Sequence, residues 1–411
     1  MAEKSAQKVA ICHSTLETMG GAERVGATLV EALNEAGITP DIFITVPSPN
    51  VGRNHLNYFY GKDLKFRLVS FLPFRVKTFG VYQKIIGSSC TFRLANYDVV
   101  VSTGGDFSPM LFSKLLPRCI LYMYAPSAVM LKNCECKAQV ASDSNYTKKH
   151  EKSLFWKIYY KPHRIISEYA MRTVKGEFLA VSKFTKWRLE KYAGLKSRVV
   201  YPPVDLKRFS AIKDNRNRNG VISIARFDPL KNQFVQLKIA KKLPNIKFRI
   251  CGSTNIPEQL KWFEYLKSKA NEMQIKNVEF YPNVEFTNLL KLIGQSKIFV
   301  HTMRYEDFGL TTCEATAGGC IPCVIDSGGQ KEVVPFRNLR FRSPEEAVRI
   351  INKIDNQDNT ELKEKLSKHI KQFDETQFKR NMLELIKERC KSTHTSFSPT
   401  CAHVYISRKR G

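Results

Sequence analysis

Two glutamates eight residues apart, Glu306 and Glu314, have the most informative types and spacing in this chain. They flank a run that reads EDFGLTTCE, which follows an apolar stretch at 298–303 and precedes a glycine pair at 318–319. A carboxylate at a strand-to-helix turn projects where open α/β sheets bind ligands, and a helix N-terminus attracts phosphate. Glu314 is expected about two turns further on, roughly on the same helix face as Glu306. Two carboxylates so placed could bind hydroxyl groups on both sides of a diphosphate, which suits a nucleotide sugar.

Solvated surface acids are the usual explanation of two glutamates at this spacing, because the spacing is common by chance. The strand-like run before them and the glycine pairs after them favour a ligand site. Two cations, Arg226 and Lys231, also follow an apolar run, at 221–225. Cations near a strand's end could neutralise a leaving diphosphate, although two surface charges remain the alternative in so basic a chain. Gly20 and Gly21 follow the first apolar run, where bare backbone can approach a ligand or simply form a turn.

Apolar runs that alternate with helical patterns predict the elements that must position these residues. In the first half, strands are expected at 9–12, 42–44, 97–102, 119–125 and 178–182, and Ser182 is expected to cap the following helix. In the second half they are expected at 221–225, 248–250, 278–280, 298–303, 320–325 and 339–341. This alternation predicts an α/β protein with two Rossmann-like, doubly wound parallel sheets that face a central cleft. The predicted divisions are a first domain at 1–200, a linker at 201–220, a second domain at 221–375, a C-terminal helix at 376–391 and a disordered tail at 392–411.

The composition is that of a soluble globular protein, with 43% hydrophobic and 25% charged residues among 411. No apolar run reaches the 18 residues or more that a membrane-spanning helix needs, and the N-terminus lacks the apolar core of a signal peptide. The 11 cysteines are scattered and have no zinc-site spacing. We therefore expect reduced, buried thiols and a cytoplasmic location.

The net charge of +28 calls for an acidic partner. Residues 62–93 hold 7 basic residues against one acid, and residues 148–175 hold 8 against two, so each stretch carries +6. Both stretches are rich in aromatic and aliphatic residues, which suits the surface of an anionic membrane. A solvated face over ordinary helices is the alternative. Nucleic acid is not expected as a partner, because no recognisable nucleic-acid motif accompanies the charge.

The glutamate run, the Arg-x4-Lys pair and the Gly-Gly-Ala-Glu-Arg start together resemble the retaining glycosyltransferases of the GT-B fold, glycosyltransferase family 4 (glycosyl transferases group 1). The resemblance implies that Glu306 contacts the donor hexose and that Glu314 binds the ribose. It implies that Arg226 and Lys231 contact the diphosphate, which Gly20 and Gly21 border. The remaining donor-binding residues that it implies act largely through backbone groups; they are Gly252, Ser253, Val284, Phe308, Gly309, Leu310 and Thr311.

The acceptor side departs from the family pattern. Many relatives have a histidine in a His-x-Pro turn near the reacting carbon, where this chain has Tyr124. Asp106, after a glycine pair, and His13, near the end of the first apolar run, are the other candidates for acceptor contact.

The resemblance implies transfer of a hexose from a nucleotide-diphosphate sugar to a lipid-linked or membrane-proximal glycan, with retention and without a metal or another cofactor. The protein would then act at the cytoplasmic face of a membrane. Two alternatives stay open: a catalytically degenerate partner subunit, and a nucleotide-sugar epimerase of the same fold. The donor base and sugar are not determined by these residues.

Overall fold

Two compact units make up the chain in the computed structural model. Unit 1 comprises Met1–Pro203 and Thr376–Gly411, and unit 2 comprises Val204–Glu375. The structure describes residues 7–13, 16, 20–47, 56–57, 60–75, 82–83, 86–87, 89–103, 119–124, 174–212 and 217–391, together with isolated residues between 154 and 173. Among the described helices, none is both long and apolar enough to cross a bilayer.

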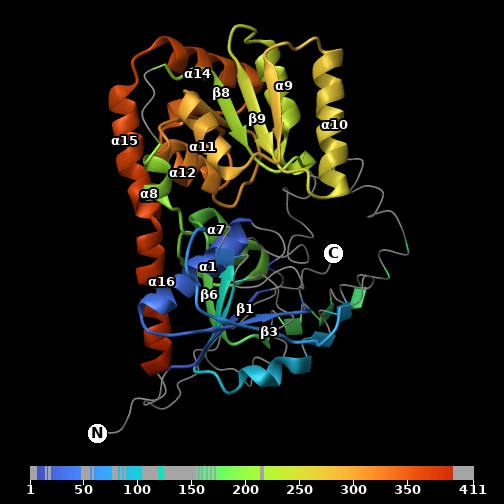
Figure 1. Ribbon diagram of the computed structural model, residues 1–411, viewed down its shortest axis with the longest axis vertical. Coiled ribbons are helices and arrows are strands. Elements are labelled where there is room, and N and C mark those ends of the chain that lie inside the picture. Colours follow the sequence, from blue (N-terminus) through green and yellow to red (C-terminus); the bar gives the residue numbers. More distant parts are fainter. Residues whose placement is uncertain are drawn as a thin grey trace, which may run out of the picture. The chain divides into compact units, whose positions relative to one another are not determined.

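Unit 1 is built on a seven-stranded parallel sheet in the order β3-β2-β1-β4-β5-β6-β7 (Figure 1). The central strands β1 and β4 are buried along their whole length, as their apolar sequences VAIC and VVVS require of a sheet covered on both faces. The Ser182 hydroxyl accepts from the Thr185 N–H at 2.9 Å, so the predicted cap is confirmed. The strands are β1 (Val9–Cys12), β2 (Asp41–Ile44), β3 (Arg67–Ser70), β4 (Val99–Ser102), β5 (Cys119–Met123), β6 (Gly176–Ala180) and β7 (Arg198–Val199), and the described helices include α1 (Gly21–Glu35), the 3-10 turn η1 (Ser89–Leu94), α7 (Lys183–Ala193) and α16 (Glu375–Lys391).

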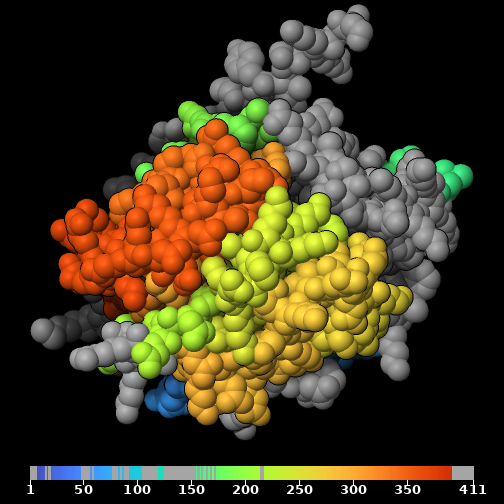
Figure 2. All heavy atoms as spheres, turned by 90° about the horizontal axis from the view of Figure 1, so that it is seen from above, coloured from blue at the N-terminus to red at the C-terminus, as the bar shows by residue number. Residues whose placement is uncertain are grey.

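Unit 2 is built on a six-stranded parallel sheet in the order β10-β9-β8-β11-β12-β13. The helices α14, α9 and α10 lie side by side on it, and Figure 2 shows them as adjoining orange, yellow-green and gold surfaces. The strands are β8 (Val221–Ile224), β9 (Phe248–Gly252), β10 (Val278–Pro282), β11 (Ile298–His301), β12 (Ile321–Ile325) and β13 (Arg340–Phe341). The helices are α8 (Leu206–Ser210), α9 (Gln233–Lys241), α10 (Pro257–Glu272), α11 (Phe286–Gln295), α12 (Leu310–Ala317), α13 (Gln330–Val333), α14 (Pro344–Asn356) and α15 (Thr360–Ile370), with 3-10 turns η4 (Pro229–Lys231), η5 (Arg337–Leu339) and η6 (Lys371–Phe373).

Two parallel α/β sheets confirm the predicted fold class, but the divisions differ from the prediction. The segment 201–220 is not a linker throughout, because it contains α8, whose Phe209 is buried in the core of unit 2. The helix α16 belongs to unit 1. The chain passes between the units at two places that lie together, since Val204 and Asp374 form an isolated parallel bridge. The predicted tail at 392–411 lies outside the described residues.

The first basic stretch is partly core rather than surface. It contains the edge strand β3, which the sequence did not predict, and its Leu64 and Phe66 are buried. Phe74 in the same stretch is 58% exposed. The apolar residues of this stretch therefore serve two roles, and only some of them are free to meet a partner.

The cysteines that the structure describes carry no disulfide, and Cys12, Cys119, Cys251, Cys313, Cys320 and Cys323 are buried. Burial raises the pKa of Cys251 and Cys320 to about 12, which keeps both thiols protonated and unreactive. Within the described ranges, no cluster of three His, Cys, Asp or Glu side chains is arranged to hold a metal ion.

An ion-pair network ties α16 to α1. Lys379 Nζ lies 2.8 Å from Glu31 and 2.6 Å from Glu35, and Glu31 also pairs with Lys62 at 2.5 Å. Burial raises the pKa of Glu31, but hydrogen bonds from Lys379 and Lys62 outweigh it, so the pKa lies below its ordinary value. This carboxylate therefore contributes stability above about pH 4.5, the ordinary value, and loses it as the pH falls through the lowered value.

Replacing Lys379 with methionine is expected to lower the free energy of unfolding of unit 1 by about 1–3 kcal/mol at pH 7, because it leaves Glu31 and Glu35 without a shared cation. Urea titration at pH 7 and at pH 3 measures this, and the difference between variant and wild type should shrink at pH 3. Lys365→Met is the control, since its pair with Glu361 is exposed and should contribute nothing measurable. Equal effects of the two substitutions would contradict the role assigned to Lys379.

Candidate functional site

The sheet of unit 2 reverses its direction of growth at β8. The next two strands, β9 and β10, lie on one side of β8, and β11, β12 and β13 lie on the other. Open α/β sheets bind ligands at the carboxyl ends of the strands where the order reverses. A ligand site is therefore expected at the residues that follow β8 and β11.

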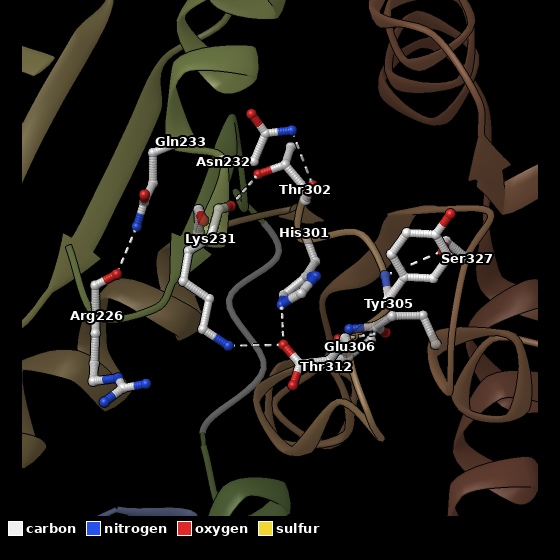
Figure 3. A network of polar contacts seen from close by, with 12 residues as sticks. Arg226, Lys231, Asn232, Gln233, His301, Thr302, Tyr305, Glu306, Thr312 and Ser327 are labelled. Carbon is white, nitrogen blue, oxygen red and sulfur yellow. Dashed lines mark hydrogen bonds and ion pairs between the residues drawn. The ribbon is translucent and has the colours of Figure 1, made fainter. Parts of the chain in front are cut away.

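Glu306 lies in the loop after β11, where its carboxylate contacts Lys231 and His301 (Figure 3). Its Oε2 lies 2.8 Å from Lys231 Nζ and 3.2 Å from His301 Nε2. Among the described residues, Oε1 of Glu306 has no hydrogen-bond or ion-pair partner, and in Figure 3 it points away from both. Because one carboxylate oxygen is held and the other is left over, Glu306 can accept hydrogen bonds from a ligand without losing its place.

The Glu306 carboxylate stays ionised at any physiological pH. Burial raises its pKa, but the charge of Lys231 and a hydrogen bond from His301 outweigh the burial and hold the pKa well below the ordinary value. The side chain is 19% exposed, so it remains within reach of a ligand. Glu306 is thus a hydrogen-bond acceptor and is unsuited to donate a proton.

Lys231 reaches Glu306 because its backbone turn is fixed. The turn η4 ends at Asn232, which has the left-handed φ of 55° that asparagine tolerates. The Thr302 hydroxyl, just after β11, donates to the Lys231 carbonyl at 2.9 Å and accepts from Gln236 at 3.0 Å. These contacts join the end of β8 to the end of β11, as Figure 3 shows.

Arg226 lies beside this network with its backbone anchored and its side chain exposed. Gln233 donates to the Arg226 carbonyl at 2.7 Å and accepts from the indole N–H of Trp262 at 3.0 Å. In the described part of the chain the Arg226 guanidinium has no ion-pair partner, and Figure 3 shows it extending away from Gln233. A guanidinium in this position is available to an anion.

The loop that carries Glu306 is held by the loop after β12. Gly329 N–H donates to the Glu306 carbonyl at 2.7 Å, and the Tyr305 N–H donates to the Ser327 hydroxyl at 3.1 Å. The glycine pair Gly328–Gly329 therefore packs directly against the backbone of Glu306.

The helix α12 begins at Leu310, four residues after Glu306, so the two glutamates do not share a helix face as predicted. Glu306 lies in the preceding turn, whereas Glu314 is in the helix and 7% exposed. Phe308 is buried with its ring 5.1 Å from that of Phe373, which fixes the turn before the helix. Gly309 is the N-cap, so the first N–H groups of α12, those of Leu310 and Thr311, follow it with no intrahelical acceptor.

The residues predicted to surround the nucleotide base lie at the ends of β9 and β10. Gly252 pairs with Pro282, and the Asn283 N–H donates to the Gly252 carbonyl at 2.8 Å. The half-buried Ser253 and Val284 follow these two strand ends. The structure thus places Gly252, Ser253 and Val284 at the carboxyl ends of β9 and β10, in the same sheet as β8 and β11.

Unit 1 has its own reversal, between β1 and β4, and a buried polar cluster lies there. His13, which is 5% exposed, contacts Thr103 at 2.9 Å and lies 3.8 Å from Glu23. Glu23 in turn accepts from the Gly20 N–H at 3.0 Å. These contacts fix the start of α1, where Gly20 is exposed and Gly21 half-buried. Gly20 and Gly21 therefore lie in unit 1, and the other predicted donor residues lie in unit 2.

Tyr124 supports the same glycine turn. Its hydroxyl donates to the Ala22 carbonyl at 3.2 Å, while the Tyr60 hydroxyl donates to the Gly20 carbonyl at the same distance. Burial raises the pKa of Tyr124 well above its ordinary value, so the phenol stays protonated. Tyr124 is thus suited to hold the turn and unsuited to act as a base. Asp106, the remaining acceptor-side candidate, lies outside the described residues.

Replacing Tyr124 with phenylalanine is expected to cost about 1 kcal/mol of stability and less than roughly 10-fold in turnover, because it removes one neutral hydrogen bond and leaves the ring in place. Thermal unfolding and steady-state kinetics measure the two effects. A loss beyond about 100-fold with unchanged unfolding would instead assign the hydroxyl a direct part in the reaction.

His301 is the residue of this site that the sequence did not single out. It is the last residue of β11 and looked like part of an apolar strand. The available signal was its polarity: a histidine that ends a strand directly before the glutamate run lies at the binding edge of the sheet.

Known proteins resemble this chain in sequence and in fold. Residues 206–373 match the model of the family described as glycosyl transferases group 1. Over 368 residues the chain is 25% identical to a GDP-Man:Man(3)GlcNAc(2)-PP-Dol alpha-1,2-mannosyltransferase of Dictyostelium discoideum. The aligned residues span 82% of this chain and 72% of the Dictyostelium protein. The enzyme of the same description from Xenopus tropicalis is 33% identical over 156 residues, which span 34% of this chain and only 32% of the relative.

Solved structures agree on the fold. A glycosyltransferase from Rickettsia africae ESF-5 superposes with a TM-score of 0.66 at 15% identity. The superposition includes 95% of this chain and 100% of the Rickettsia chain. Anabaena Alr3699/HepE, solved in complex with UDP, gives a TM-score of 0.67 at 12% identity and covers 93% of this chain and 100% of its own. The chain therefore has the GT-B fold, residues 206–373 form a glycosyl transferases group 1 domain, and the protein is a hexosyltransferase.

Proposed function

We propose that this protein transfers mannose from GDP-mannose to a lipid-linked glycan, with retention of configuration, as a member of glycosyltransferase family 4. The observation that carries the proposal is the arrangement at the carboxyl edge of the unit 2 sheet. There Glu306 is fixed and ionised with one free oxygen, beside Lys231 and the exposed Arg226. The choice of donor and acceptor is supported by the relatives, which are described as GDP-Man:Man(3)GlcNAc(2)-PP-Dol alpha-1,2-mannosyltransferases.

In this proposal unit 2 binds the donor. The free oxygen of Glu306 accepts hydrogen bonds from mannose hydroxyls, and Glu314 on α12 binds the ribose. Arg226 and Lys231 neutralise the diphosphate, assisted by the backbone N–H groups of the turn at Phe308 and Gly309 and of Leu310 and Thr311, the first residues of α12. Gly252, Ser253 and Val284 surround the base through their backbone groups.

The reaction that we propose breaks the bond from the mannose anomeric carbon to the diphosphate and forms one to an acceptor hydroxyl on the same face. The acceptor proton passes to the departing phosphate oxygen, so the protein need not supply a base. Arg226 and Lys231 stabilise the charge that develops on the leaving diphosphate, which is the part that a metal plays in other transferases. We therefore expect transfer to persist in EDTA.

The acceptor side belongs to unit 1 in this proposal. Gly20 and Gly21, which border the diphosphate, lie in a turn that the Tyr60 hydroxyl supports at the Gly20 carbonyl and the Tyr124 hydroxyl supports at the Ala22 carbonyl. His13 is buried, so we assign it to support of this turn and not to contact with the acceptor. Asp106 keeps its predicted place as an acceptor contact.

We also propose that unit 1 meets an anionic membrane at the cytoplasmic face. Two stretches of unit 1, 62–93 and 148–175, hold seven of the exposed large hydrophobic side chains that the structure describes: Phe74, Ile86, Phe92, Leu154, Ile158, Ile165 and Tyr169. Basic residues surround them in the sequence, at about 1 kcal/mol each near an anionic surface. Co-sedimentation with vesicles that contain phosphatidylserine tests this, and protein that stays in the supernatant at low salt contradicts it.

The decisive experiment incubates the protein with dolichyl-diphosphate-linked Man3GlcNAc2 and each of GDP-mannose, UDP-glucose and UDP-N-acetylglucosamine, and identifies products by mass. Addition of one hexose from GDP-mannose alone is the expected result. The donor at 100 times its dissociation constant should also stabilise the protein by about 2.7 kcal/mol against unfolding. Stabilisation without transfer would favour the degenerate partner subunit, and interconversion of the sugar nucleotides without acceptor would favour the epimerase.

A further inference from the structure

Burial and packing do not explain why residue 301 is a histidine. The side chain is 4% exposed at the carboxyl end of β11, where pairing with Val324 of β12 fixes its backbone. Its ring stacks near Phe299 at 6.4 Å between centroids. An apolar residue would serve the core equally well, yet Nε2 of the imidazole lies 3.2 Å from Glu306 Oε2.

The other ring nitrogen of His301 settles which atom carries the proton. Nδ1 is buried and has no hydrogen-bond partner among the described residues. A proton on Nδ1 alone would be an unsatisfied donor, and the bare Nε2 would face an anionic oxygen. A proton on Nε2 is donated to Glu306 and leaves Nδ1 as an unsatisfied acceptor only. The carboxylate therefore selects the form of His301 that donates from Nε2.

Lys231 cannot be the lasting partner of Glu306 if it also serves the diphosphate. Both Lys231 and His301 contact the same oxygen, Oε2. A diphosphate that arrives beside Lys231 competes for its ammonium, which is a flexible point charge. The imidazole is fixed on a strand, so it would remain on Oε2.

We propose that His301 is a positioning residue, which holds the Glu306 carboxylate in place through Nε2–H when the donor engages Lys231. The inference rests on the proposed function in that it takes the ligand of Glu306 to be the donor hexose. It names a role for a residue that acts through Glu306 and does not touch the substrate.

Two substitutions separate this role from simple packing. The side-chain amide nitrogen of glutamine reaches the place of Nε2, whereas that of asparagine reaches only the place of Nδ1. In His301→Asn we expect kcat with GDP-mannose to fall roughly 100-fold, because Glu306 is no longer held to its place. The Kd for GDP, which has no hexose, should stay within about twofold. In His301→Gln we expect kcat to recover to within roughly 10-fold of wild type.

A kcat in His301→Asn equal to that of wild type would overturn the proposal, as would equal losses in both variants or a parallel loss of GDP affinity. Thermal unfolding of each variant identifies any that fail to fold. A substrate-free measurement stands beside the kinetics: the imidazole nitrogen shifts of His301, from protein with ¹⁵N-labelled histidine, should show the proton on Nε2. A proton on Nδ1 alone would overturn the proposal even if the transfer reaction itself proved to be different. Failure of the wild type to transfer any hexose would refute the proposed function while leaving this test of His301 in force.

Discussion

Replacing Glu306 with glutamine is expected to reduce the proposed mannose transfer by roughly 1,000-fold or more, which is the largest effect that a single side chain of this site should have. The amide keeps the shape of the carboxylate but removes its charge. The hydrogen bond from His301 and the ion pair with Lys231 both lose their anionic acceptor. The free oxygen that should accept from the hexose hydroxyls becomes a weaker acceptor. Steady-state kinetics with GDP-mannose and a lipid-linked acceptor measure the loss.

Two controls make the Glu306→Gln result specific. Glu285→Gln makes the same chemical change at an exposed position beyond the end of β10 and should leave turnover unchanged. The Kd for GDP should change little in Glu306→Gln, since GDP lacks the hexose that Glu306 is proposed to bind. Unaltered turnover in this variant would end the proposed mechanism. Because the pKa of Glu306 lies well below its ordinary value, protonation of Glu306 should not limit transfer between pH 5 and 8.

The site could be predicted from the sequence where side chains and glycines mark it. Glu306, Arg226 and Lys231 each follow an apolar run, and strand ends are where a parallel sheet binds ligands. The structure brings Glu306 and Lys231 into contact, as that logic requires. His301 carries a weaker signal, because it is a single histidine at the end of an apolar run. Its role depends on the carboxylate of Glu306, five residues further on in the loop that follows β11.

The fold could be predicted in class but not in every connection. The two-residue strand β7 and the edge strand β3 carry little periodic signal, and β3 lies in a stretch dominated by basic residues. The helix α8 has five residues, too few for a pattern, so its segment read as a linker. The return of α16 to unit 1 depends on contacts such as Lys379 with Glu31, which are far apart in the chain and leave no local pattern.

The loop after β12 packs against the loop that carries Glu306, and this close packing explains why glycines occur there. The loop after β12 crosses the backbone of the loop that carries Glu306 so closely that no side chain fits between them. A Cβ at Gly328 would lie 2.4 Å from the Glu306 carbonyl oxygen, and one at Gly329 would lie 2.2 Å from that of Asp307. The position of the Glu306 carboxylate therefore depends on Gly328 and Gly329 as much as on the strand before it.

Replacing Gly328 with alanine is accordingly expected to destabilise unit 2 by about 3–5 kcal/mol and to reduce transfer roughly 100-fold. Gly328 has a φ of +67°, which alone costs an alanine about 1–2 kcal/mol. The rest of the effect comes from the clash with backbone atoms of Tyr305 and Glu306, which cannot rotate away as a side chain would. Urea unfolding and steady-state kinetics measure the two losses.

Gly194→Ala separates the clash from the backbone conformation. Gly194 has nearly the same φ, +66°, but a Cβ there would meet nothing within 4 Å. It should cost only about 1–2 kcal/mol, the conformational part, and leave transfer unchanged. If Gly328→Ala proves no more harmful than Gly194→Ala, the two loops are not in close contact, and the position of Glu306 must be set elsewhere. If Gly328→Ala lowers stability while transfer per folded molecule is retained, the contact of Gly328 and Gly329 with the Glu306 loop stabilises the fold but does not position the carboxylate. Gly328→Ala is expected to lose both stability and transfer only if this backbone contact supports the fold of unit 2 and the position of Glu306 together.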